Sequence, residues 1–327
     1  DWDECIYGQY AKEMLNSRHF FTNIWNGYID LQKPPLYSWL LNIPALFGRT
    51  ELNLRFLNVI GSLALISSVY VFSQQYFSRK VAILSSLILL TGEVFVIYTM
   101  KINTDILYSL FIFLGACGWL SSKKRGFWIA GLFFGLAIMV KGLGVTQFLG
   151  ALFISLFINF RKEQLLNFLK LCFITGLIIL PWHVSTYVTY GNHFLKVYIQ
   201  DSIIRRSQYP LEFHRERVWF YFVLLYRELF PWLFAFIVFP LVVMLNLFQH
   251  HSGKFKIKKF LKLAQDNLKK NELIYTLLLL IVVPLLGITK VQTRIAWYIL
   301  PIYPFIAIYL AYCLNLLLDL VSEKFPK

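Results

Sequence analysis

Residues 105–141 read DILYSLFIFLGACGWLSSKKRGFWIAGLFFGLAIMVK, two apolar runs joined by a short basic turn. An apolar helix of about 17 to 25 residues crosses the roughly 30 Å hydrocarbon core of a bilayer, so we expect spans near 105–121 and 126–141. Their apolar character is continuous and not alternating, which favours helices over a porin-like barrel. Asp105 begins the first run and Lys141 ends the second. Two consecutive spans therefore place an acid and a base on one face of the membrane.

The whole chain has the composition of a membrane protein. It is 58% hydrophobic and 15% charged, with a mean hydropathy of +0.59, whereas soluble domains are about one quarter charged. The sequence therefore predicts an all-α polytopic membrane protein with about nine spans. Besides the pair above, spans are expected near 53–76, 81–99, 143–160, 165–190, 218–248, 273–289 and 295–318.

Charge in the connections predicts the orientation. Four connections are rich in lysine and arginine: 78–80, 123–125, 161–162 and 254–270. They alternate in side with the others, so all four fall on one face, which the positive-inside rule makes the cytoplasm. Cytoplasmic loops then explain the net charge of +15, and no nucleic-acid partner is expected. The other polar positions then fall on the extracytoplasmic face, and they include every candidate site residue. These positions are 1–33, 100–105, Lys141, 191–217 and 290–294.

The N-terminal part is expected to differ from the rest. Residues 1–52 predict an extracytoplasmic loop with interfacial helices, and residues 53–327 predict the transmembrane helix bundle. One face of the first helix is expected to carry Asp3, Tyr7, Tyr10 and Met14. A second short helix begins at Pro34-Pro35, since proline is tolerated in a first turn, and ends near Gly48. The chain opens inside this polar loop without a methionine or signal peptide, so we expect a further transmembrane helix before it.

Asp3 and Glu4 are the first candidates for chemistry, close to Tyr7. Transfer of a sugar to a hydroxyl or an amine uses a carboxylate that accepts or orients the acceptor proton near an anomeric carbon. The alternative is a pair of solvated loop acids. The lysine motif and the aromatic residues of the same loop favour the catalytic interpretation.

Lys33 is the candidate for binding a phosphate. Pro34 restricts Lys33 to an extended conformation. The helix that follows presents the positive end of its dipole, so an ammonium and free backbone N–H groups face the same anion. The alternative is a lysine that only extends to the membrane interface.

Asp105 and Lys141 also have two interpretations. Asp105 caps the helix that it begins, or it contributes to catalysis. Lys141 extends to the interface from the end of its span, or it binds the same phosphate as Lys33. Ionisable groups within a membrane are usually functional when they share a polar cavity, which keeps both residues as candidates.

Further basic residues are candidates for the same anion. Arg205 and Arg206 suit a phosphate or pyrophosphate through forked donors, and they suit anionic lipid headgroups equally well. Lys290 lies in another polar turn of the same face. His214 is a weak candidate for a metal ligand, because a single histidine does not make a site. The four scattered cysteines predict neither a metal site nor a disulfide framework.

An ordered set of short motifs runs through the chain. It comprises Asp1-Trp2-Asp3-Glu4-Cys5-Ile6-Tyr7, Gln32-Lys33-Pro34-Pro35-Leu36, Asn103-Thr104-Asp105, Gly135-Leu136-Ala137 with Lys141-Gly142, Pro181-Trp182, His214-Arg215, Phe230-Pro231-Trp232 and Trp297-Tyr298-Ile299-Leu300-Pro301-Ile302-Tyr303-Pro304. These segments resemble the bacterial lipid-linked-sugar glycosyltransferases of the GT-C fold. The likeness is nearest to the family of the 4-amino-4-deoxy-L-arabinose lipid A transferase and the dolichyl-phosphate-mannose protein mannosyltransferases. It covers nearly the whole chain.

The resemblance implies an inverting transfer from an undecaprenyl- or dolichyl-phosphate sugar on the outer face. It makes Asp3 the catalytic or acceptor-orienting residue and Lys33 the ligand of the carrier phosphate, with Asp105 and Lys141 lining the same cavity. It also implies a transmembrane helix before the acidic motif and, in some relatives, a C-terminal periplasmic domain. Gln32 departs from the pattern, since several relatives have a glutamate there that is implicated in metal binding. No cofactor is firmly expected, and Gln32 argues against a divalent metal ion.

Together these expectations describe a hexosyl- or pentosyltransferase of the bacterial inner membrane with an extracytoplasmic active site. Its partners are expected to be a polyprenyl-phosphate-linked sugar donor, membrane lipids and an acceptor, which is a glycolipid such as lipid A, a protein or another glycan. The main alternative is a transporter or flippase of a polar or lipid-linked solute, although the sequence has no evident inverted repeat. A noncatalytic assembly subunit is a second alternative, and it predicts that the outer acids can be neutralised without effect.

Overall fold

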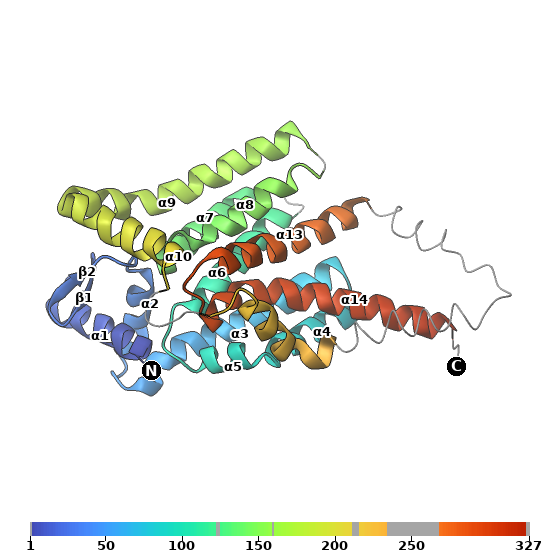
Figure 1. Ribbon diagram of the computed structural model, residues 1–327, viewed down its shortest axis with the longest axis horizontal. Coiled ribbons are helices and arrows are strands. Elements are labelled where there is room, and N and C mark those ends of the chain that lie inside the picture. The colour runs from blue at the N-terminus through green and yellow to red at the C-terminus, as the bar shows by residue number, and fades with distance from the viewer. Residues whose placement is uncertain (1, 122–124, 159, 211–215, 234–267, 325–327) are drawn as a thin grey trace.

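The computed structural model describes residues 2–121, 125–158, 160–210, 216–233 and 268–324, which are mostly helical (Figure 1). A small layer that contains α1, α2 and a hairpin covers one end of a helix bundle, and the last turns of α14 lie at the opposite end. The bundle contains α3 (Glu51–Tyr76), α4 (Arg79–Leu90), α5 (Glu93–Thr99), α6 (Asp105–Leu120), α7 (Gly126–Lys141), η1 (Leu143–Val145), α8 (Thr146–Ser155), α9 (Lys162–Leu195), η2 (Lys196–Arg205), α10 (Arg206–Gln208), α13 (Leu268–Lys290), η3 (Ala296–Ile302) and α14 (Tyr303–Lys324).

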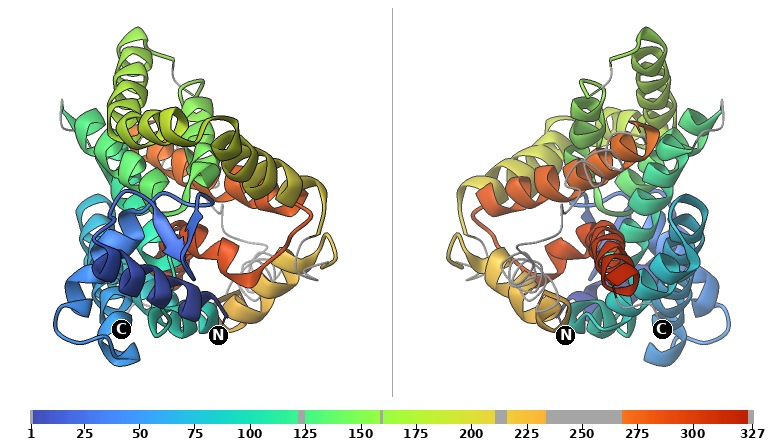
Figure 2. Two further views of the ribbon diagram at one scale, coloured as in Figure 1. Left: turned by 90° about the vertical axis from the view of Figure 1, so that its left-hand side faces the viewer. Right: turned by 90° about the vertical axis from the view of Figure 1, so that its right-hand side faces the viewer.

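The end layer consists of α1 (Trp2–Ser17), β1 (Asn23–Trp25), β2 (Tyr28–Asp30) and α2 (Leu36–Ala45). The first predicted helix is confirmed: α1 buries a face that includes Tyr7, Tyr10 and Met14. The second is confirmed as well, because α2 follows Pro34-Pro35 and ends before Gly48. In the left view of Figure 2, α1 and the hairpin lie across the end of the bundle.

The hairpin was not predicted. β1 and β2 pair antiparallel around Asn26 and Gly27, whose φ angles are 52° and 79°. A two-residue turn with two positive φ angles matches the twist of the strands and favours Asn-Gly, which is the sequence signal for this hairpin. The Glu13 carboxylate of α1 accepts hydrogen bonds from the backbone N–H groups of Asn26 at 2.7 Å and Gly27 at 3.0 Å. These bonds attach the turn to α1.

One span was expected near 81–99, but the segment is not one continuous helix. It consists of α4 and α5, which are bent by 72° relative to each other. At the break, Glu228 Oε2 accepts the Val94 N–H at 3.1 Å. A side chain thus supplies the acceptor that an uninterrupted helix would supply from its own backbone. The partner is 134 residues away along the chain, so the break has no local signal.

Other predicted spans differ in their ends. The segment near 143–160 begins as the 3₁₀ helix η1, after Gly142 at a φ of 102°. The segment near 295–318 begins as the 3₁₀ helix η3, which contains Pro301. In the segment near 218–248, residues 220–233 are helical. Residues 234–248 lie outside the described residues.

Several helices are long and apolar enough to cross a membrane. Among the described residues there are four: Glu51–Tyr76, Lys162–Gln208, Glu272–Lys290 and Ala296–Leu316. The bent pair of α4 and α5 makes a fifth if it forms one span, and α6, α7 and Leu143–Ser155 are shorter apolar helices. The chain is a multi-pass membrane protein. The number of nine spans stays a prediction.

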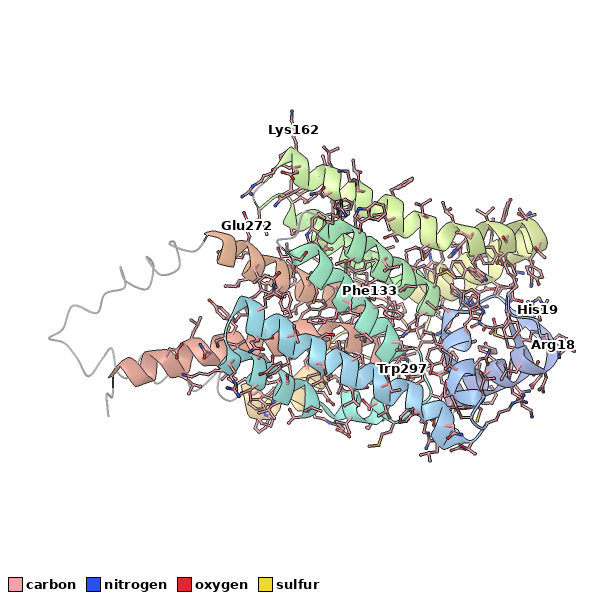
Figure 3. The ribbon with its side chains drawn as sticks, turned by 180° about the vertical axis from the view of Figure 1, so that it is seen from behind. Arg18, His19, Phe133, Lys162, Glu272 and Trp297 are labelled. Atoms are coloured by element: carbon pink, nitrogen blue, oxygen red, sulfur yellow. The ribbon has the colours of Figure 1, made fainter. Side chains whose placement is uncertain are left out.

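Loops that were assigned to different faces lie at opposite ends of the molecule. Figure 3 shows Arg18 and His19 at one end and Lys162 and Glu272 at the other. Arg161, in one of the predicted cytoplasmic connections, contacts the first turns of α13, since Arg161 Nη2 lies 3.5 Å from Glu272 Oε1. The positive-inside rule predicts that this second end faces the cytoplasm.

Close helix packing fixes the relative positions of α6, α7 and α9. A Cβ atom added to Gly131 of α7 would lie 2.7 Å from Ile174 Cβ of α9, which is closer than real Cβ contacts. Small residues allow membrane helices to approach in this way. The packing holds the end of α7 beside the start of α6, where Lys141 and Asp105 are located.

Candidate active site

The end of the bundle that α1 covers brings together charged side chains from separate segments. Lys33, between β2 and α2, donates a hydrogen bond from Nζ to the Tyr7 hydroxyl of α1. Lys141, at the end of α7, donates to Asp105 Oδ1 at the start of α6. The carboxylates of Asp3 and Asp105 both act electrostatically on Lys33. Of the acids and bases that were expected on one face, Asp3, Lys33, Asp105 and Lys141 therefore lie at the same end of the bundle.

Lys33 is a partly buried cation. Burial disfavours its charged form, but the Tyr7 hydroxyl and the carboxylates of Asp3 and Asp105 raise the pKa of Lys33 above its usual range. The Tyr7 ring centroid also lies 4.9 Å from Nζ, within the range of a cation–π contact. Lys33 therefore remains positively charged at neutral pH and provides a fixed charge for an anion.

The backbone of Lys33 is held by two buried polar residues. Asn23 Nδ2 donates to the Lys33 carbonyl at 3.0 Å, and Ser38 Oγ donates to Asn23 Oδ1 at 2.7 Å. Asn23 and Ser38 are each only 2% exposed. Buried amide and hydroxyl groups that are fully hydrogen-bonded restrict local conformations. The hairpin and α2 thus fix the backbone at Lys33, and with it the direction in which the Lys33 side chain extends.

Asp105 and Lys141 form a buried ion pair, with side chains that are 3% and 17% exposed. The Lys141 ammonium also lies 4.9 Å from the Tyr298 ring centroid and 5.6 Å from that of Tyr108. The Asp105 N–H donates to Asn103 Oδ1 at 2.9 Å. Each charged group thus has a partner, so the pair forms a rigid polar wall beside Lys33.

Glu4 and Asp3 are adjacent in α1 but have different surroundings. Glu4 Oε1 accepts hydrogen bonds from Arg55 Nε and from the Ile102 N–H, each at 3.0 Å. Burial opposes ionisation, but these hydrogen bonds lower the pKa of Glu4. Glu4 thereby attaches α1 to α3 and to the loop before α6. Within the described part of the chain, the Asp3 carboxylate forms no hydrogen bond or ion pair and remains available to a bound molecule.

Asn58, about two turns from the start of α3, belongs to the site but was not predicted. Its side chain is fully buried. Asn58 Nδ2 donates to the carbonyls of Lys101 at 2.6 Å and Asn103 at 2.8 Å, and Oδ1 accepts the Tyr37 hydroxyl at 3.3 Å. These bonds hold the loop from which α6 starts, so Asn58 positions Asp105. An amide inside an apolar run is the sequence signal for such a role.

Replacing Asn58 with leucine should lower both stability and activity. The variant leaves two carbonyls and one hydroxyl in a buried region without their donor or acceptor, at a cost of about 1–3 kcal/mol in the free energy of unfolding. Thermal unfolding in detergent measures this loss. Ser68→Ala is the matched control in the same helix, because among the described residues the Ser68 hydroxyl bonds only to the carbonyl of Ala64, one turn earlier. Equal unfolding midpoints for the two variants would contradict the role of Asn58.

The remaining predicted cations gather around α10. Arg205 lies 3.9 Å from Asp201 and is mostly exposed. The Thr293 N–H donates to the carbonyl of Arg206 at 3.3 Å, so the turn after Lys290 lies beside the arginines. Contact of these cations with a carrier phosphate stays a prediction.

Metal ligands are sparse in the described ranges. Those ranges contain no group of three or more His, Cys, Asp or Glu side chains that would hold a metal ion. Gln32 is exposed, and its backbone N–H donates to Asp30 Oδ1 at 2.8 Å. His214 lies outside the described residues.

An apolar cavity of about 280 Å³ opens between α2, α7 and α9. Its walls include Leu36 and Trp39 of α2, Met139 of α7 and Trp182 of α9. Leu36 belongs to the same short motif as Lys33. A lipid chain in this cavity would therefore have a cation near one of its ends.

The arrangement combines three chemical functions at one end of the bundle. A fixed ammonium can neutralise a phosphate, a carboxylate without a protein partner can accept a proton, and an apolar cavity can hold a hydrocarbon chain. These are the requirements for a reaction on a phosphate-bearing lipid at the edge of a membrane.

Comparisons with known proteins agree with this chemistry. Residues 32–185 match the family described as Dolichyl-phosphate-mannose-protein mannosyltransferase. An uncharacterized protein of Aquifex aeolicus (strain VF5) is 28% identical over 72% of this chain and 48% of its own length. An undecaprenyl phosphate-alpha-4-amino-4-deoxy-L-arabinose arabinosyl transferase of Shewanella sediminis (strain HAW-EB3) is 22% identical over 71% of this chain and 44% of its own length. The chain spans about half the length of the curated relatives that it matches.

Solved structures show the fold. The crystal structure of ArnT from Cupriavidus metallidurans bound to undecaprenyl phosphate matches with a TM-score of 0.71 and 17% identity, over 97% of this chain and 55% of that one. The Archaeoglobus fulgidus oligosaccharyltransferase in complex with Zn and sulfate matches with a TM-score of 0.56 and 17% identity, over 99% of this chain and 46% of that one. The predicted GT-C type helix bundle and the resemblance to lipid-linked-sugar glycosyltransferases are confirmed.

Proposed function

We propose that this chain, which resembles the lipid-linked-sugar glycosyltransferases and has the GT-C type fold, moves a sugar from a polyprenyl-phosphate carrier to an acceptor hydroxyl or amine. The observation that supports this most is the cluster of Asp3, Lys33, Asp105 and Lys141 at one end of the bundle. A transferase needs a cation for the leaving phosphate and a base for the acceptor. The relatives reported above that have a functional name are transferases, so the transporter alternative gains no support.

The reaction is a displacement at the anomeric carbon. The acceptor oxygen or nitrogen forms a bond to that carbon, and the bond between the carbon and the phosphate oxygen breaks on the opposite side, which inverts the configuration. The electron pair goes to the phosphate, whose negative charge the Lys33 ammonium balances. The acceptor proton goes to the Asp3 carboxylate. Because phosphate is a good leaving group, positioning of the reactants and stabilisation of the phosphate charge supply most of the lowering of the activation barrier.

Asp105 and Lys141 have a different part in this scheme. Their mutual ion pair keeps both side chains fixed, with Tyr298 and Tyr108 against the ammonium. They form the wall against which the sugar and the phosphate are oriented. Glu4 holds the loop before Asp105 in place, because its carboxylate accepts a hydrogen bond from the backbone N–H of Ile102.

The carrier chain occupies the apolar cavity between α2, α7 and α9. A polyprenyl chain has no polar groups to satisfy, which suits walls made of leucine, methionine and tryptophan side chains. The carrier then reaches Lys33 from the side of the bundle without leaving the bilayer. The described helices on both sides of the cavity, α7 and α9, present apolar surfaces to the lipid.

A tryptophan at Ser185 should weaken carrier binding. Ser185 is exposed and lines this cavity, so the larger side chain occupies space that the carrier needs. Loss of contact with about two methylene groups is worth roughly 1.5 kcal/mol, or about tenfold in donor KM. Leu132→Trp is the matched control, since Leu132 lies on the exposed surface of α7. Equal donor KM values in the two variants would exclude the cavity as the carrier site.

The proposed location is the bacterial inner membrane, with the site at its extracytoplasmic face. The acceptor is a glycolipid, a protein or another glycan at that face. Arg205, Arg206 and Lys290 remain candidates for a second contact to the carrier or the acceptor.

Comparing the cell envelope with and without the gene tests this function. Mass spectrometry of extracted glycolipids and envelope proteins should reveal a hexose- or pentose-sized mass that is lost on deletion and restored by the wild-type gene but not by an Asp3→Asn variant. Identical mass profiles in all three strains would contradict a sugar transferase.

A further inference from the structure

A second cavity of about 350 Å³ lies between α1 and the start of α3. Glu4, Gly8 and Lys12 line it from α1. These residues are four positions apart and share one face of the helix, whereas Tyr7 and Tyr10 point into the core. The cavity therefore opens on a different side of α1 from Tyr7, which binds Lys33, and it borders the candidate active site only at Glu4 and Ile102.

The charged residues of this cavity are predominantly basic. Its walls include Lys12, Arg49 and Arg55 against Glu4 and Glu51. Arg55 is paired with both acids, at 3.0 Å from Glu4 and 3.3 Å from Glu51. Both acids are therefore held by Arg55, three cations and two acids leave a net charge of +1, and Lys12 and Arg49 are the cations that do not pair with these acids.

Those two cations are exposed at the rim. Arg49 Nη1 donates to the neutral side chain of Asn16 at 2.8 Å. In the described part of the chain, neither Lys12 nor Arg49 forms an ion pair with a carboxylate. An anion at the rim would therefore gain two charge-assisted contacts without displacing an acid.

Exposed apolar side chains lie beside the cavity. Leu46 and Phe47, which follow α2, are 74% and 85% exposed, and Leu52 in the first turn of α3 is 79% exposed. α3 is one of the helices long enough to span a membrane. Cations beside such exposed apolar groups, at the start of a span, lie at the depth of lipid headgroups.

We propose that this cavity binds the phosphate headgroup of an anionic membrane lipid. Lys12 and Arg49 contact the phosphate, and the acyl chains run along Leu46, Phe47 and Leu52. The volume is sufficient for a headgroup, since small-molecule sites begin at about 300 Å³. The site is independent of the proposed sugar transfer, because it is separated by α1 from the residues that carry that proposal.

Lipid binding to the purified protein tests the proposal. The charge-removing variant is Lys12→Gln with Arg49→Gln, and the matched control is Arg18→Gln with Lys196→Gln, which removes two exposed cations that do not line the cavity. Native mass spectrometry in detergent measures the affinity for phosphatidylglycerol, with phosphatidylcholine and inorganic phosphate as further probes. At about 1 kcal/mol per cation, the first variant should bind phosphatidylglycerol about thirtyfold more weakly, while the control binds as the wild type does.

Each of four outcomes would overturn the proposal. Equal losses in the two variants would indicate diffuse charge attraction. Equal affinity of the wild type for phosphatidylcholine would exclude selection of an anionic headgroup. Inorganic phosphate that binds as tightly as phosphatidylglycerol would identify a site for a free anion and not for a lipid. If the double variant fails to fold, each single substitution should still weaken phosphatidylglycerol binding about fivefold, and no loss in either would also overturn the proposal.

Discussion

In the Asp3→Asn variant, sugar transfer should fall about 10²–10⁴-fold, the usual contribution of a general base. The amide is close in size to the carboxylate but does not accept the proton that the acceptor must lose. Asp3 has no hydrogen-bonded partner in the described part of the chain, so the substitution breaks no structural contact there. Initial rates of transfer from a polyprenyl-phosphate sugar in reconstituted membranes measure the effect.

Two further measurements make this prediction specific. Binding of the carrier without sugar should stay within about twofold of wild type, because Lys33 is unchanged. Cys5→Ser, an exposed substitution in the same helix, should retain wild-type transfer. Near wild-type turnover of Asp3→Asn would remove Asp3 from the mechanism, and a large loss in Cys5→Ser would mean that disturbance of α1 alone explains the effect.

Lys33→Met should weaken binding of the carrier about thirtyfold or more. Removal of one partner from a hydrogen-bonded charge pair costs about 2–5 kcal/mol, and each 1.4 kcal/mol is tenfold in affinity. The methionine side chain retains most of the length of the lysine, so the loss comes chiefly from the charge. Equilibrium binding of undecaprenyl phosphate and of undecaprenol, its uncharged analogue, measures the effect. The wild type should prefer the phosphate strongly, and the variant should bind the two lipids alike.

The controls for this prediction vary charge and position. Lys33→Arg keeps the charge but not the fit against the Tyr7 hydroxyl, so its affinity should lie between those of the wild type and Lys33→Met. Lys196→Met removes an exposed cation from η2 and should leave carrier binding unchanged. An unchanged preference for the phosphate in Lys33→Met would show that the phosphate binds elsewhere.

The sequence was sufficient to predict the meeting of Asp105 and Lys141. An apolar run locates the start and end of each span to within a few residues, and a short basic turn forces neighbouring spans to be antiparallel. An acid that begins one span and a base that ends the next must then lie at the same face. Their ion pair needs only the close approach of α6 and α7.

Contacts between distant segments could not be predicted from the sequence. Asn58 bonds to the carbonyl of Lys101, 43 residues away, and Glu228 bonds to the N–H of Val94, 134 residues away. Each bond replaces a partner that is normally found within a turn of helix, so neither leaves a local pattern. The positioning of Asp105 and the break between α4 and α5 depend on these contacts.

The distinction between Asp3 and Glu4 illustrates the same limit. Two adjacent carboxylates in a polar loop are equivalent candidates when only the sequence is considered. In the folded chain, α1 directs Glu4 toward Arg55 and the backbone of Ile102, whereas the Asp3 carboxylate helps to raise the pKa of Lys33. Tertiary structure thus separates a carboxylate with a structural role from one that is available for chemistry.

The most direct test of the central claim follows both products of one reaction. The purified protein is placed in vesicles with a polyprenyl-phosphate donor that carries a labelled sugar and with an envelope extract as the source of acceptors. The wild type should release one carrier phosphate for each labelled sugar that becomes covalently attached to an acceptor. Movement of the intact donor across the bilayer without either product, or binding of the donor without bond cleavage, would contradict the account.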